Sequence, residues 1–116
     1  VPGMNLTVDS TPALTCIAVE GELDTATAPD LDLAIQACLA DGATALLLDL
    51  TSTDYVSSMG LRVFLSTLKS LKTSGGRLVL SGLNDEVQEI IDLAGFAPLF
   101  EICDTADQAR AALGGD

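Results

Sequence analysis

The sequence predicts a single α/β domain built as a layered sandwich, with a mixed sheet of about five strands and about four helices. Its 116 residues suit one hydrophobic core. After residue 24, short apolar segments alternate with amphipathic ones, an order typical of parallel strands joined by crossover helices. Segment 44–50 is nearly all aliphatic, which indicates a central strand covered on both faces.

The first half begins with two strands and a helix. Strands at 5–8 and 14–19 flank a Ser-Thr-Pro turn, so we expect an antiparallel hairpin. Apolar residues at helical spacing predict a helix over 25–40, with Asp24 or Thr25 as its cap. The central strand is followed by a polar loop, and Ser57 and Ser58 open the next helix.

The second half continues the alternation of helix and strand. The body of the second helix is predicted over 61–71 and ends at a Ser-Gly-Gly stop signal. The elements expected after it are a strand at 77–81, a helix at 84–93 capped by Asn84, a strand at 98–103 and a terminal helix at 105–113. We take residues 1–116 as one domain, with 1–3 as a candidate cloning remnant ahead of Met4.

Composition excludes several classes of function. Five basic against seventeen acidic side chains give a net charge of −12, which argues against a nucleic-acid partner. The first basic residue is Arg62, so every charged side chain before it is acidic. A basic protein surface is therefore the expected partner. With no His and three scattered cysteines, we expect no metal site, no cofactor and no disulfide. No apolar run is long enough to insert in a membrane, and the expected location is the cytoplasm.

Enzyme chemistry is not indicated by any pattern in the chain. Catalysis by a serine and a histidine is excluded because there is no His, and no phosphate-binding glycine loop is present. Asp49 and Asp54 suggest an aspartyl-phosphate receiver domain. Such a domain also needs an acid pair after its first strand and a lysine after its last, and neither is found where required. We therefore expect a binding protein.

Two serines at a predicted helix start are the strongest local signal. A hydroxyl there can accept a hydrogen bond from a free backbone N–H group, worth about 1 kcal/mol. The same N–H groups and the helix dipole can also accommodate a phosphate. Arg62 follows Ser58 by four residues, one helical turn, and could pair with a phosphate there or be a solvated surface charge. Local chemistry alone favours capping and leaves phosphorylation open.

Five segments along the chain are informative as a set. They are Gly-Glu-Leu-Asp at 21–24, the strand at 46–50, Tyr-Val-Ser-Ser-Met-Gly-Leu at 55–61, Gly-Gly at 75–76 and Leu-Ala-Gly-Phe at 93–96. Together they resemble the STAS domain of bacterial anti-sigma factor antagonists. The resemblance covers essentially the whole chain. It implies a binding partner controlled by phosphorylation.

The resemblance further implies partners and a site. The unphosphorylated form would bind an anti-sigma factor that is also a serine kinase of the histidine-kinase-like ATPase fold, which frees the sigma factor. Phosphorylation would end the complex and a serine phosphatase would reset it. The acceptor position of the family falls on Ser58, with Ser57 as the alternative; Ser57 stands where the family has an acid, and Met59 where it has a second serine. The expected partner surface comprises Asp24, Asp54, Ser57, Ser58, Met59, Gly60 and Arg62.

A second function remains open at this point. A STAS module can also be a constitutive interaction or scaffold subunit, of a stress-sensing assembly or of a lipid-transport complex. In that case Ser58 would serve only to cap the helix.

Overall fold

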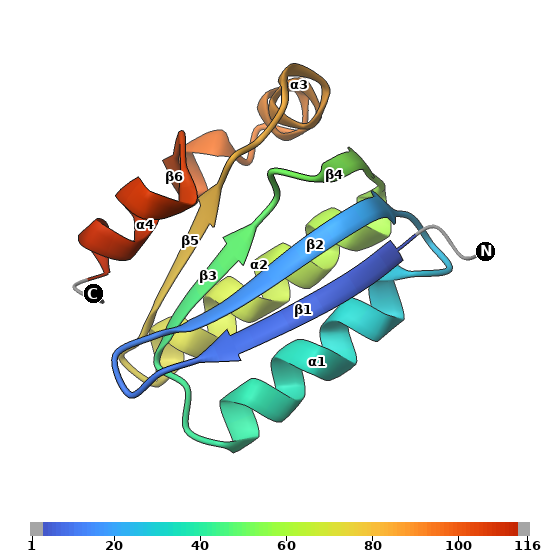
Figure 1. Cartoon of the computed structure of the whole chain (residues 1–116). Helices are drawn as coiled ribbons and strands as arrows, with labels where there is room; N and C mark the ends of the chain where they lie inside the picture. Colours follow the sequence, from blue (N-terminus) through green and yellow to red (C-terminus); the bar gives the residue numbers. More distant parts are fainter. Residues whose placement is uncertain (1–3, 114–116) are drawn as a thin grey trace.

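A six-stranded mixed sheet with helices on both faces forms the molecule (Figure 1). It is seen in a computed structural model that describes residues 4–113. The elements in chain order are β1 (Met4–Ser10), β2 (Thr15–Leu23), α1 (Ala28–Ala40), β3 (Ala45–Asp49), β4 (Thr53–Val56), α2 (Ser58–Thr73), β5 (Arg77–Ser81), α3 (Asp85–Leu93), the 3-10 turn η1 (Ala97–Leu99), β6 (Glu101–Cys103) and α4 (Ala106–Ala112).

The sheet has the order β1-β2-β3-β5-β6, which places β3 at its centre as predicted. β1 and β2 form the expected antiparallel hairpin, and the other pairs are parallel. Both hairpin strands are longer than predicted because their register runs without a break from Met4 opposite Gly21 to Ser10 opposite Thr15. The predicted α/β sandwich of about five strands and four helices is confirmed.

Two hydrophobic clusters cover the faces of the sheet unequally. On one face α1 and α2 lie side by side, and α3 adds Val87 and Ile91 at the end where β4 lies (Figure 1). On the opposite face the single helix α4 covers a smaller cluster, formed by Leu14, Cys16, Leu47, Val79 and Ala109. Aliphatic side chains fill both clusters, with Phe64 and Phe100 meeting edge to face at a centroid distance of 6.3 Å. The three cysteines are free.

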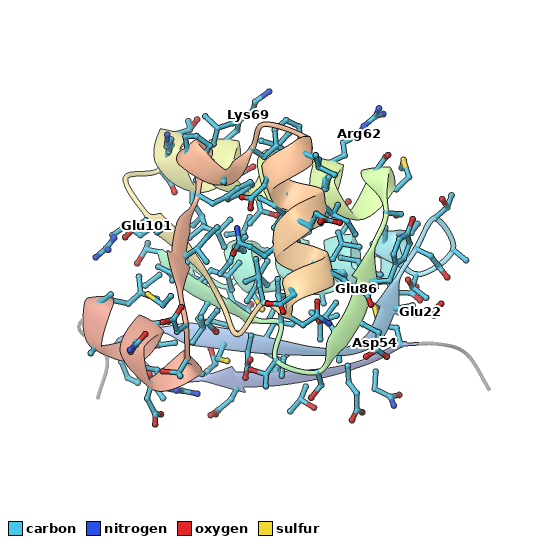
Figure 2. The ribbon with its side chains drawn as sticks, turned by 90° about the horizontal axis from the view of Figure 1, so that it is seen from above. Glu22, Asp54, Arg62, Lys69, Glu86 and Glu101 are labelled. Carbon is cyan, nitrogen blue, oxygen red and sulfur yellow. The ribbon has the colours of Figure 1, made fainter. Side chains whose placement is uncertain are left out.

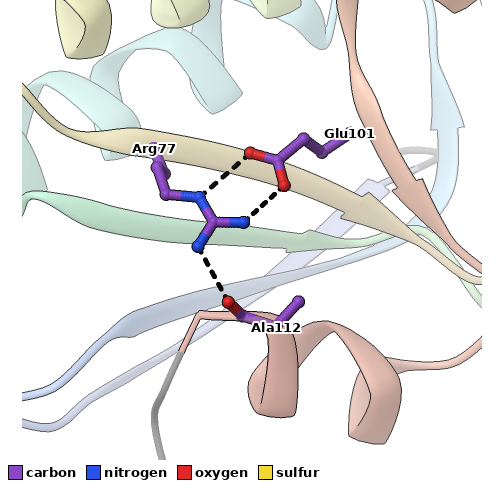
Figure 3. Close-up of polar contacts among 3 residues, drawn as sticks. All are labelled: Arg77, Glu101 and Ala112. Atoms are coloured by element: carbon purple, nitrogen blue, oxygen red, sulfur yellow. Dashed lines mark hydrogen bonds and ion pairs between the residues drawn. The ribbon is translucent and has the colours of Figure 1, made fainter.

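An arginine on β5 adds a polar link between the sheet and α4. The Arg77 guanidinium donates to both carboxylate oxygens of Glu101 on β6, with Nε to Oε1 at 3.0 Å, and donates through Nη1 to the carbonyl of Ala112 at 2.8 Å (Figure 3). This planar double contact is the strong form of a guanidinium–carboxylate pair. It is the one ion pair found within residues 4–113.

The loop predicted after the central strand is partly a strand. β4 continues along β2 beyond the end of β3, pairing Gly21 with Thr53 and Leu23 with Val56. Thr53 holds it in place, since the residue is 1% exposed and its hydroxyl donates to the carbonyl of Val19 at 2.7 Å. Sequence reasoning missed this strand because its four residues are buried only at the two ends, with two exposed residues between them, so they form no apolar pattern typical of a strand.

Helix α1 begins later than predicted. Its N-cap is Thr27, so the expectation of Asp24 or Thr25 as cap was wrong. Pro29 stands in the first turn, where a missing N–H is harmless, and residues 25–27 form a turn ahead of it.

A second proline shortens the last strand: Pro98 lies in η1, and β6 covers only Glu101–Cys103. The predicted cap of α3, Asn84, is confirmed by its side-chain bond from the N–H of Val87.

Candidate functional site

The start of α2 places two adjacent serines in opposite environments. Ser57 is the N-cap, and its Oγ accepts a hydrogen bond from the backbone N–H of Gly60 at 3.2 Å. Its own N–H donates to the carbonyl of Leu23 at 2.8 Å, which ties the helix start to the end of β2. Only 9% of Ser57 is exposed. The Ser57 hydroxyl is therefore used inside the fold, as the capping interpretation predicted.

Ser58 is the first residue of α2, and it is exposed. Within residues 4–113 its hydroxyl has no hydrogen-bond partner. In any α-helix, the backbone N–H groups at the N-terminal end have no carbonyl partner inside the helix. Here the Gly60 N–H is satisfied by the Ser57 hydroxyl, which leaves the N–H groups before it without a partner in α2. These donors and the positive end of the helix dipole lie beside Ser58, so the position can accept added negative charge.

The residue after Met59 has no room for a side chain. A Cβ placed on Gly60 would lie 2.9 Å from side-chain atoms of both Leu23 and Val56. The first turn of α2 therefore sits directly against the ends of β2 and β4, and its position is fixed by that contact. Met59 itself is half-buried and lines a hollow of about 210 Å³ between α1 and α2, together with Asp32 and Arg62.

Asp24 is occupied by its own turn. Its Oδ1 accepts from the backbone N–H groups of Ala26 and Thr27, each at 2.9 Å, and from the Thr27 hydroxyl at 3.1 Å. These bonds, that from the Thr27 N–H foremost, hold the pKa of the Asp24 carboxyl below its ordinary value. Asp24 is thus a turn-forming residue, and its carboxylate lies just after the β2 end that Ser57 contacts.

Asp54 and Arg62 stand on different sides of the helix start. Asp54 is exposed on β4, in the irregular step where Gly21 pairs with Thr53 and Glu22 with Tyr55. Figure 2 shows Asp54 in the same region as Glu22 and Glu86, which come from β2 and from the first turn of α3. Arg62 points outward on another side, from the exposed face of α2. The predicted residues therefore frame the start of α2, with acids on one flank and a cation on the other.

Two side chains that support this arrangement, those of Thr27 and Asn84, were not among the predicted site residues. The Thr27 hydroxyl accepts from the N–H of Asp24 and donates to the carbonyl of Glu22, both at 2.8 Å, and so closes the turn after β2. The Asn84 side chain donates to the carbonyl of Thr53 at 3.1 Å and links α3 to β4. Capping preference marks Asn84 in the sequence, but no local pattern marks its long-range bond to Thr53.

Residues 4–113 contain no group of three or more His, Cys, Asp or Glu side chains placed to hold a metal ion. The described part of the chain also has no helix that is both long and apolar enough to cross a membrane.

Comparison with known proteins assigns the chain to a family. The STAS domain family matches residues 5–109. An anti-sigma factor antagonist of Bordetella bronchiseptica, BtrV, is 34% identical over 109 residues, which are 94% of this chain and 94% of that protein. The crystal structure of an anti-sigma factor antagonist from Mycobacterium paratuberculosis superposes with a TM-score of 0.87 at 29% identity, covering 96% of this chain and 94% of the other.

A more distant structural relative has been solved in two states. SpoIIAA, a Bacillus cell fate determinant, superposes in its unphosphorylated form with a TM-score of 0.80 at 18% identity, covering 95% of this chain and 97% of that one. Its phosphorylated form gives a TM-score of 0.74 at 19% identity, over 94% and 99% of the two chains. This likeness establishes the shared fold. By family match, by relatives and by structure, the chain belongs to the STAS-domain family of anti-sigma factor antagonists.

Proposed function

We propose that the chain is a phosphorylation-controlled binding protein of the cytoplasm and not an enzyme. Unphosphorylated, it binds an anti-sigma factor serine kinase of the histidine-kinase-like ATPase fold and thereby frees a sigma factor. Phosphorylation of Ser58 ends the complex, and a serine phosphatase restores it. The observation that carries the proposal is the contrast at the start of α2, where Ser57 is buried in the cap and Ser58 is exposed.

This contrast favours Ser58 over Ser57 as the acceptor. A kinase needs a hydroxyl that can approach the γ-phosphate in line, and an exposed side chain at a helix start allows that approach. A phosphate on Ser57 would lose the bond to the Gly60 N–H and would have to fit where only 9% of the residue is exposed. Phosphorylation of Ser57 would therefore cost fold stability, whereas phosphorylation of Ser58 would not.

The effect of a phosphate on docking follows from solvation. The group adds about −1.5 to −2 charges, and free N–H groups at the helix start, with Arg62 one turn along, stabilise it in the free protein. A partner that covers Ser58, Met59 and Gly60 would have to strip water from this charge. Burying a charge without a matched partner costs several kcal/mol, so the complex is released while the fold stays intact.

The test is intact mass with site mapping, after the purified chain is incubated with ATP and the anti-sigma factor serine kinase of the same organism. We expect one phosphate on Ser58 in the wild type and in Ser57→Ala, and none in Ser58→Ala. Affinity for the kinase should fall at least about tenfold, equivalent to about 1.4 kcal/mol, on phosphorylation or in Ser58→Glu. Ser58→Ala should bind like the wild type.

Two results would contradict the proposal. A Ser58→Glu variant that binds as tightly as the wild type would remove the switch. An unmodified chain, together with binding that neither Ser58 substitution changes, would identify a constitutive scaffold subunit instead.

A further inference from the structure

The exposed face of α2 carries cations in a strongly acidic chain. Arg62, Lys69 and Lys72 are all exposed on this helix, and they are three of the five basic residues. Figure 2 shows Arg62 and Lys69 pointing out from the same side of the molecule. Of the other two cations, Arg77 is paired with Glu101 and Arg110 is on α4, which covers the opposite face of the sheet. The outer face of α2 is thus locally basic, although the net charge is −12.

A partly apolar hollow lies at the C-terminal end of the same helix. It has a volume of about 260 Å³ and lies between the last turns of α2, the start of β5 and the segment from η1 to β6. Its apolar lining comes from Leu68, Leu78, Pro98, Leu99 and Phe100. Lys72 and the paired side chains of Arg77 and Glu101 supply its polar lining, so within residues 4–113 Lys72 is its one basic group without an acidic partner in the hollow. Leu99 is 50% exposed, which is high for a large aliphatic side chain.

The hollow is separate from the Ser58 site. Lys72 follows Ser58 by fourteen positions on the helix, a rise of about 21 Å along the axis. This separation exceeds the screening length of about 8 Å at physiological salt, so a phosphate on Ser58 has little effect on the potential at Lys72. Both ends of α2 can therefore be occupied independently.

We propose that Lys69, Lys72 and this hollow form a second docking surface, for an acidic, leucine-bearing helical segment of a partner protein. A leucine of that segment fills the hollow beside Leu99, and flanking carboxylates face Lys69 and Lys72. We choose an acidic partner because of charge complementarity. The acidic remainder of the chain repels an acidic segment, so the segment is directed to the exposed basic face of α2. This surface goes beyond the proposed Ser58 switch and stays open when Ser58 is phosphorylated.

Fluorescence anisotropy with a labelled synthetic helix tests the proposal on the full chain. The probe carries leucines at every third or fourth position and glutamates on its other faces, and a matched probe carries lysines in place of the glutamates. We expect saturable binding of the acidic probe only, with affinity reduced at least about tenfold in Lys69→Glu/Lys72→Glu and several-fold in Leu99→Ser. Amide NMR shifts should center on residues 68–72 and 98–101.

Two control variants separate this surface from bulk charge and from the switch. Arg110→Glu makes the chain more acidic on α4, which covers the opposite face of the sheet, and Ser58→Glu imitates the phosphate; both should bind within about twofold of the wild type. Circular dichroism confirms that each variant is folded. No saturable binding of the acidic probe, equal binding of both probes, or an equal loss in Arg110→Glu would overturn the proposal.

Discussion

The two ends of α2 differ in what they offer a partner. At the N-terminal end, backbone geometry dominates: Ser57 caps the helix, Gly60 packs against β2 and β4, and Ser58 remains exposed. At the C-terminal end, side chains dominate: Lys72 lines a partly apolar hollow, and Lys69 is exposed one turn before it. One helix can thus hold a rigid modification site and a chemically distinct surface, each of which can change without the other.

The largest expected effect comes from filling the tight contact at the N-terminal end. Gly60→Val would force a branched side chain against Leu23 and Val56, where even a Cβ would be 2.9 Å away. Overpacking of this kind costs about 2–3 kcal/mol, and urea unfolding measures it. Gly75→Ala is the matched change after the C-terminal end: no atom lies within 4 Å of the new Cβ, and only its φ of +81° opposes it. It should cost about 1 kcal/mol, and an equal loss in both variants would refute the packing difference.

A smaller effect distinguishes the two serines. Ser57→Ala removes the acceptor for the Gly60 N–H and should lower the free energy of unfolding by about 1 kcal/mol. Ser58→Ala changes an exposed hydroxyl and should stay within about 0.5 kcal/mol of the wild type. Thermal or urea unfolding of both variants provides the comparison. If Ser58→Ala were the more damaging change, the assignment of Ser57 as the structural serine would be wrong.

The smallest effect belongs to the ion pair beside the C-terminal hollow. The hydrogen bond from Arg77, more than its charge, lowers the pKa of the Glu101 carboxyl. A lowered pKa means that the pair stabilises the fold at neutral pH and that this contribution is lost as the pH falls through the folded-state pKa. Glu101→Gln should cost about 0.5 kcal/mol at pH 7, because both side chains are about half exposed.

Urea unfolding over a pH series checks this sign. The difference between the wild type and Glu101→Gln should shrink as the solution is made acidic, and a difference that grew in acid would contradict the assignment.

Much of the fold could be predicted because its signals are local. The central strand shows as an aliphatic run, and Asn84 and Thr105 mark helix starts through side chains that cap them. The misses have non-local causes. Strand β4 depends on a hydroxyl of Thr53 that bonds a carbonyl on β2, and no pattern within four residues reports such a bond. The late start of α1 depends on Pro29 and the turn before it, which the apolar spacing does not record.

The candidate site was predictable in part for the same reason. Two serines at a helix start are visible in the sequence, but which one is buried is decided by packing against β2 and β4. The place of Asp24 at the partner surface stays a prediction; the structure adds that its carboxylate also accepts bonds from the backbone of its own turn. Such bonds within the fold depend on chain geometry, and the residue types alone do not report them.

The bond from the Ser57 N–H to the carbonyl of Leu23 has a consequence for the order of events in the cell. It joins segments more than thirty positions apart, with the whole of α1 between them. Ser58 therefore takes its exposed position at the start of α2 only after the long-range pairing of β2 with β4 is complete. An extended nascent chain would display the same serine without the helix start around it. A kinase that recognises this geometry would phosphorylate folded chains only. The amount of phosphorylated protein would then follow the amount of folded protein, and not the rate at which new chains are made.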